Sequence, residues 1–88
     1  MYRIELNNSL FDYLIKILDS QELKNKVLEK EYRQHNVTYL DLDVDTKLDL
    51  MEYVEDKQLE VGFDEKYNLN DDGRNLQAIY DEIYRQTN

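Results

Sequence analysis

Carboxylates dominate one stretch of the chain, and their spacing changes along it. Every second residue is acidic from position 41 to position 45, whereas acids recur every three or four residues from there to position 60. The first spacing is that of one face of a β-strand, and the second is that of one face of a helix. The candidate partner-binding residues on these two faces are Asp41, Asp43, Asp45, Asp49, Glu52, Tyr53, Asp56 and Glu60.

One segment, residues 41–72, carries the whole charge imbalance of the 88-residue chain, whose formal net charge is −9. Acids and bases balance at six each in residues 1–40 and at two each in residues 73–88, whereas residues 41–72 hold twelve acids against three lysines. Because nucleic acids and anionic membranes are bound by clustered Lys and Arg, this distribution disfavours direct binding to either. A basic protein surface or a cation is the electrostatically matched ligand.

Residues 41–52 are similar in their acid spacing to the calcium loop of the EF-hand. Loop positions 1, 3, 5, 9 and 12 are acidic, and these are positions from which oxygen atoms reach Ca²⁺. The glycine of the EF-hand turn is replaced by Thr46, whose branched side chain suits a positive φ poorly. We therefore expect no cofactor and no specific calcium response. The alternative is a Ca²⁺-binding module with the ligands Asp41, Asp43, Asp45, Asp49 and Glu52.

Residue types suited to catalysis are scarce, so we predict that the protein is not an enzyme. His35 is the single histidine and is expected at a helix end, while Ser9 and Ser20 are placed to cap helices. The chain has no cysteine, which excludes a thiolate nucleophile and fits a reducing cytoplasm. The sequence contains neither the apolar run of a membrane span nor a leader typical of secretion, so we expect a cytoplasmic protein.

The elements before the acidic stretch supply apolar surface. Residues 2–6 alternate apolar and polar side chains, which predicts a short strand. Asn8 or Ser9 should cap a strongly apolar helix, and a second, more charged helix is predicted over residues 21–35. A single bent helix over residues 9–35 is the alternative.

The first part of the acidic stretch should belong to a strand over residues 37–44, and a helix should follow that strand. Thr46 and Asp49 resemble a capping box, so the helix is expected to begin there and to end before Gly62. The predicted apolar side of this helix, opposite the acids, consists of Leu50, Met51, Val54 and Val61.

A last helix is predicted after Asn70 or Asp71. The segment leading into it, residues 67–76, resembles the passage from wing strand to helix in winged-helix regulators, and we interpret it as a strand–cap–helix junction. The apolar face of this last helix consists of Leu76, Ile79, Tyr80, Ile83 and Tyr84.

The patterns together predict an α+β fold for residues 1–88 as one small acidic domain. Two to four helices should pack on a short two- or three-stranded sheet that contains residues 37–44 and residues 2–6. The side chains expected to be buried are Leu14, Ile15, Leu18, Leu42, Val54, Leu76, Ile79 and Ile83.

The favoured function is that of a non-enzymatic, acidic protein-binding module. Its partner would be a basic protein surface, for example that of a nucleic-acid-binding protein, and the module would act as an inhibitor that mimics nucleic acid. Small acidic proteins of this kind are typical of phages and mobile elements. Two alternatives are the Ca²⁺-binding module and a structural protein that forms a homodimer through apolar, tyrosine-rich surface.

Overall fold

The fold contains one three-stranded antiparallel sheet. The computed structural model describes residues 1–87, and its strands are β1 (Tyr2–Asn7), β2 (Glu31–Arg33) and β3 (Val37–Leu42). β3 lies between the other two, in the order β1-β3-β2. Tyr2 is paired with Leu42 across β1 and β3, and Tyr32 is paired with Tyr39 across β2 and β3.

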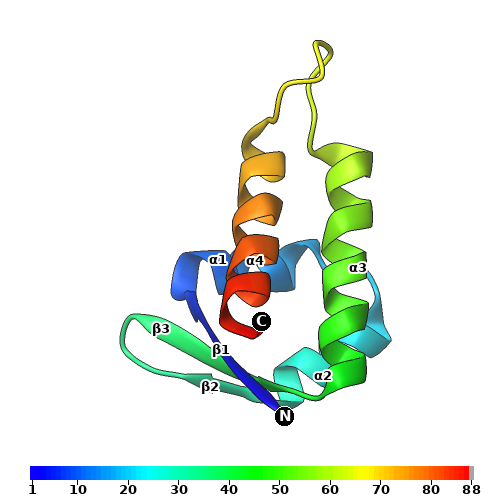
Figure 1. The fold of residues 1–88 in the computed structure, drawn as a ribbon. Helices are drawn as coiled ribbons and strands as arrows, with labels where there is room; N and C mark the ends of the chain where they lie inside the picture. Colours follow the sequence, from blue (N-terminus) through cyan, green and yellow to red (C-terminus); the bar gives the residue numbers. More distant parts are fainter. Residues whose placement is uncertain (88) are drawn as a thin grey trace.

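Helices complete the fold and confirm the predicted α+β class. The four helices are α1 (Asn8–Ile17), α2 (Gln21–Glu29), α3 (Val44–Val61) and α4 (Asp71–Thr87). The two long helices α3 and α4 run antiparallel, and the loop that joins them projects away from the rest of the molecule (Figure 1). α4 also packs against β1, and α2 packs against α3. Among residues 1–87, no helix is both long and apolar enough to cross a membrane.

One hydrophobic core joins the sheet to the helices. It contains Ile4 and Leu6 of β1, Leu40 and Leu42 of β3, and side chains from all four helices. The predicted burial is confirmed for Leu14, Leu18, Leu42, Val54, Leu76, Ile79 and Ile83. It is wrong for Ile15, which is half-buried at the edge of the core.

The helix predicted over residues 21–35 is too long. α2 ends at Glu29, and β2 and a turn containing His35 follow, so that neither a helix end at His35 nor a continuous helix over residues 9–35 exists. The competing interaction is pairing with β3, in which the rings of Tyr32 and Tyr39 lie 6.3 Å apart. Such cross-strand pairs stabilise a sheet whatever the local helix propensity.

The boundary between β3 and α3 lies earlier than predicted. β3 ends at Leu42, and Val44 is the first residue of α3 and half-exposed. The helix cap is Asp43 rather than Thr46, because a carboxylate oxygen of Asp43 accepts a hydrogen bond of 2.7 Å from the Thr46 backbone N–H. Aspartate is among the strongest capping residues, and it stops the strand where it starts the helix.

The junction before α4 contains the predicted helix cap, but the predicted strand is reduced to a single isolated bridge. Asn70 accepts a hydrogen bond from the Gly73 N–H, and only an isolated bridge between Phe63 and Leu69 precedes it. α1 is capped by Asn7 instead of Asn8 or Ser9. Ser20 caps α2, and α3 ends at Val61 with Gly62 as its C-cap, both as expected.

Candidate functional site

Five carboxylates form an exposed row along α3, which we call the acidic face: Asp45, Asp49, Glu52, Asp56 and Glu60. The helix that carries them has a cap residue at each end, Asp43 at the start and Gly62 at the finish. Leu50 and Val54 anchor the opposite side of α3 in the core. The acids are therefore displayed on a firmly docked helix rather than on a loose segment.

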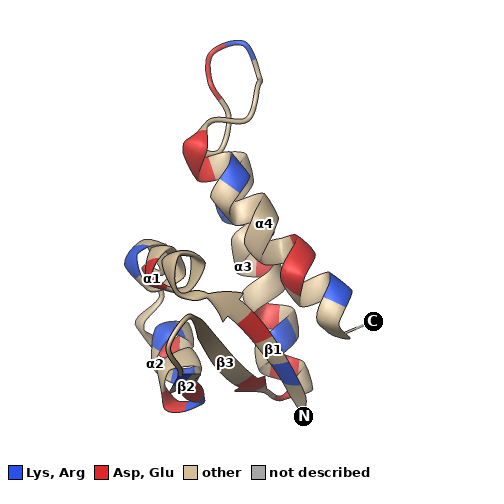
Figure 2. Cartoon of the chain, turned by 90° about the vertical axis from the view of Figure 1, so that its left-hand side faces the viewer, with Lys and Arg blue, Asp and Glu red and all other residues tan. Residues whose placement is uncertain are grey.

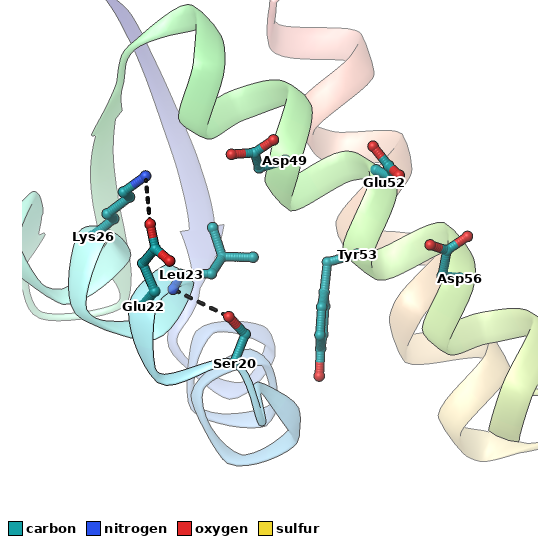
Figure 3. Close-up of a pocket in the computed structure, with 8 residues that line it drawn as sticks. All are labelled: Ser20, Glu22, Leu23, Lys26, Asp49, Glu52, Tyr53 and Asp56. Atoms are coloured by element: carbon teal, nitrogen blue, oxygen red, sulfur yellow. Dashed lines mark hydrogen bonds and ion pairs between the residues drawn. The ribbon is translucent and has the colours of Figure 1, made fainter.

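A hollow of about 330 Å³ separates the acidic face from α2. Asp49, Glu52 and Asp56 project from the α3 wall, and an ion pair between Glu22 and Lys26 lies on the α2 wall, with 3.6 Å between its charged atoms (Figure 3). The remaining lining comes from Ser20, Leu23 and Tyr53. Four carboxylates therefore share this groove with one ammonium group.

Tyr53 has a structural role that its sequence context did not reveal. Its hydroxyl oxygen lies 2.8 Å from both the Ile17 carbonyl oxygen and an Asp19 carboxylate oxygen, and it accepts the Asp19 backbone N–H at 3.0 Å. Partial burial raises the pKa of Tyr53 above the ordinary tyrosine value. The ring remains a wall of the groove, but the hydroxyl is committed to joining α3 to the end of α1.

Asp41 is not a free anion either. Arg3, opposite it on β1, donates two hydrogen bonds to its carboxylate, at 2.8 and 3.0 Å. The Arg3 side chain holds the pKa of Asp41 below the ordinary aspartate value. Because this pair is internally neutralised, Asp41 adds little attraction for a basic partner.

The negative charge of Asp43 interacts with the N-terminus of α3, the helix that Asp43 caps. The Thr46 backbone N–H is the main cause of a lowered Asp43 pKa. Asp43 also lines a second hollow with Asp45, Lys26 and Lys30, where opposite charges are mixed. Of the eight predicted partner-binding residues, Asp41, Asp43 and Tyr53 are thus held by internal bonds, and the acidic face remains.

The two lysines of α3 do little to neutralise the acidic face. Lys47 is buried, and its ammonium nitrogen lies 4.6 Å from the centre of the Tyr2 ring. Lys57, whose side chain is only 12% exposed, contacts Asp19 at 3.0 Å and Glu60 at 3.5 Å. Within residues 1–87, Glu60 alone among the five acids makes an ion pair; none involves Asp45, Asp49, Glu52 or Asp56.

The contribution of α2 to the groove was missed at the level of sequence. Glu22, Leu23 and Lys26 lie more than twenty residues before Asp49, and neither their types nor their spacing links them to it. The pairing of β2 with β3 and the Tyr53 hydrogen bonds bring α2 and α3 together. No local pattern could have signalled this arrangement.

The calcium loop of the alternative hypothesis is not formed. Residues 44–52 are consecutive turns of α3, so their side chains spread around a helix and cannot wrap around one ion. Within the described part of the chain, no group of three His, Cys, Asp or Glu side chains is arranged to hold a metal ion.

Elsewhere the surface charges are mixed. β1 and α4, which face the viewer in Figure 2, carry acidic and basic residues in alternation. On α4, ion pairs join Arg74 to Asp71 and Arg85 to Glu82. Comparison of the chain with protein-family models, curated proteins and solved structures finds no match.

Proposed function

We propose that the protein is a non-enzymatic binding module whose acidic face engages a basic surface of a partner protein. The observation that carries this proposal is the separation of charges on α3. Four carboxylates stand in a row without an ion pair among residues 1–87, while the two lysines of the same helix are held away from them. A face that served only solubility would not require one sign of charge, since mixed charges serve as well.

The length of the row suits an extended basic segment. At 1.5 Å of rise per residue, the acidic face spans about 22 Å from Asp45 to Glu60. Neighbouring acids are three or four residues apart, so their side chains start roughly 5–6 Å from one another. One strand of DNA presents a phosphate about every 3.4 Å along its axis. The face is a sparser version of such an array, which supports mimicry of nucleic acid.

The groove beside the row supplies a place for individual side chains. A guanidinium group can form paired hydrogen bonds with a carboxylate and stack on an aromatic ring. Asp49 and Asp56 offer the carboxylates, and Tyr53 and Leu23 offer apolar walls between α3 and α2. We infer that arginine is preferred over lysine at this point of the interface.

A partner that binds nucleic acid through the same basic surface would be inhibited by competition. The cytoplasm is the compartment that fits a cysteine-free chain. In this setting the protein would act as a decoy that occupies the partner's site, as small proteins of phages and mobile elements do.

The proposal is tested by reversing the charge of the row. In the triple variant Asp49→Lys, Glu52→Lys and Asp56→Lys, all three positions are exposed, so the fold should survive. The matched control reverses three exposed acids away from the groove, Glu5, Glu31 and Glu65, with the same change in net charge. Binding of an arginine-rich peptide, and of proteins captured from a cytoplasmic extract, is then compared among the three proteins.

The face variant should lose binding while the control keeps most of it. Added salt should weaken the wild-type interaction mainly by lowering its association rate. DNA or RNA should displace the captured partner if the protein mimics nucleic acid. Equal loss in both triple variants would mean that net charge alone matters, and full binding by the face variant would refute the proposal.

A further inference from the structure

A second exposed surface of α3 is apolar, and we call it the outer strip. It continues onto α4. Each of its members except Met51, which is half-buried, leaves more than half of its area exposed. The outer strip consists of Val44, Leu48, Met51 and Leu59 of α3 and Tyr84 of α4.

Helical geometry places the α3 members on one side of that helix. At 100° per residue, they fall within roughly 80° of arc, centred about 100° away from the centre of the acidic face. Val44, Leu48 and Met51 follow the four–three spacing of a helix-packing seam, and Glu55 occupies the next seam position. The strip is therefore separate from the groove and shaped to receive another helix.

The register between α3 and α4 places Tyr84 at the same level as the strip along the helix pair. The side-chain amide of Gln58 donates to Gln77 at 3.0 Å and to the Gly73 carbonyl oxygen at 3.1 Å. Met51 lies seven residues before Gln58 on α3, and Tyr84 lies seven residues after Gln77 on α4. Because the two helices are antiparallel, Met51 and Tyr84 are therefore level with each other. The half-buried Tyr80 lies one turn earlier on α4. The outer strip thus extends from α3 onto α4 at an exposed part of the α3–α4 hairpin.

We propose that the outer strip is the interface of a homodimer, in which two α3–α4 hairpins pack against each other. Aromatic side chains bury about 150–250 Å², so Tyr84 alone leaves roughly 100 Å² to cover. The whole strip leaves on the order of 500 Å², at the upper end of the apolar patches of monomers. With a polar rim this approaches the roughly 800 Å² that each partner contributes to a stable interface.

The charge distribution favours a second copy over a basic partner at this surface. Glu55 is the single charged residue within the α3 arc of the strip, so a basic protein finds little to pair with. Two copies with a net charge of −9 repel each other, and the outer strip is a side on which they can meet with their acidic faces directed apart. Each dimer would then display two acidic faces.

The first test is the mass of the protein in solution. Sedimentation or light scattering should give twice the chain mass of 10.7 kDa, with dissociation on dilution. Salt should leave the dimer unchanged or strengthen it, because it screens the repulsion between the copies. A monomer mass up to millimolar concentration would overturn the proposal.

Substitutions within and outside the strip locate the interface. Leu48→Glu and Leu59→Glu should each weaken the dimer by about tenfold or more, because each places a charge within the buried interface. The matched control is Leu28→Glu, which changes an exposed leucine on α2 and should leave the dimer intact. Circular dichroism melting shows whether each variant is folded, so that loss of dimer is not confused with unfolding.

A gain of affinity provides a test that unfolding cannot imitate. Glu55→Leu removes a like-charge contact and extends the apolar seam, so it should tighten the dimer by about tenfold. The triple reversal of Asp49, Glu52 and Asp56 should not weaken the dimer, because it lowers the net negative charge that drives the two copies apart. This outcome separates the proposal from the function of the acidic face. A dimer that responds equally to the strip variants and to Leu28→Glu would contradict the assigned interface.

Discussion

The hydroxyl group of Tyr53 lies 2.8 Å from a carboxylate oxygen of Asp19, 34 residues earlier in the chain. It also accepts the Asp19 backbone N–H and lies 2.8 Å from the Ile17 carbonyl oxygen. One side chain therefore provides hydrogen-bond partners for the segment between α1 and α2. It also fixes the distance between that segment and α3. The groove beside the acidic face depends on this connection.

Removing that hydroxyl should weaken the fold. Tyr53→Phe leaves the ring in place but deprives the Asp19 N–H of its acceptor, so the free energy of unfolding should fall by about 1 kcal/mol. Urea denaturation measures the change. The control Tyr67→Phe removes a hydroxyl from a side chain that is 86% exposed, and its unfolding midpoint should not move. Equal effects of the two substitutions would show that the Tyr53 hydrogen bonds contribute nothing.

The Asp43 cap should make stability depend on pH. Its hydrogen bonds from Thr46 lower the pKa of Asp43 in the folded protein below the ordinary value of 3.8. This stabilisation is present above the unfolded pKa and is lost as the pH falls through the folded value. Wild type should be more stable than Asp43→Asn at pH 7, and the difference should shrink toward about pH 3, below the usual aspartate pKa.

This comparison cancels the general effect of acid on a highly charged chain, since both proteins share the other carboxylates. The measurement is the free energy of unfolding in urea at each pH. A wild-type advantage that is constant across the range would mean that the cap does not act through its charge.

Core truncations should separate the fully buried side chains from those at the edge. Leu14→Ala and Ile79→Ala each open a cavity in the interior and should cost about 2–5 kcal/mol. Ile15→Ala, one residue after Leu14 but half-buried, should cost clearly less. Thermal unfolding monitored by circular dichroism provides the comparison, and an equal loss at positions 14 and 15 would refute the observed orientation of α1.

The close approach of α3 to α4 depends on glycine. A Cβ atom added to Gly73 would lie 2.1 Å from the Gly62 carbonyl oxygen, which must then shift. Gly73→Ala should therefore lower the free energy of unfolding by about 1–3 kcal/mol, although alanine favours helices. Asn75→Ala, at a half-buried position of the same helix, is the control and should be close to neutral. A stabilised Gly73→Ala protein would show that the helices can separate freely.

Calcium should have no specific effect on stability. The acids of residues 44–52 lie on a helix, so their oxygen atoms are not gathered around one point. The melting temperature should be the same in excess calcium and in chelator, since only a ligand that prefers the folded state stabilises it. A calcium-dependent rise that Glu52→Gln removes would instead restore the cation-binding alternative.

Periodicity alone was sufficient for much of the fold. The alternation of β1 and β3 and the apolar faces of α1, α3 and α4 predicted the α+β fold and seven of the eight core residues that were named. These patterns are reliable because burial imposes the period of each element directly on its sequence. The exposure of the acidic face follows from the same rule, since its acids lie opposite Leu50 and Val54.

The tertiary structure decided which polar groups are bonded within the protein and which are free to bind a partner. Arg3 neutralises Asp41 from a neighbouring strand, Asp19 and Glu60 hold Lys57, and Tyr53 bonds to the segment after α1. β2 forms because β3 offers it a partner, not because residues 31–33 prefer a strand. Each of these outcomes depends on contacts between residues far apart in the chain, and local periodicity carries no record of such contacts.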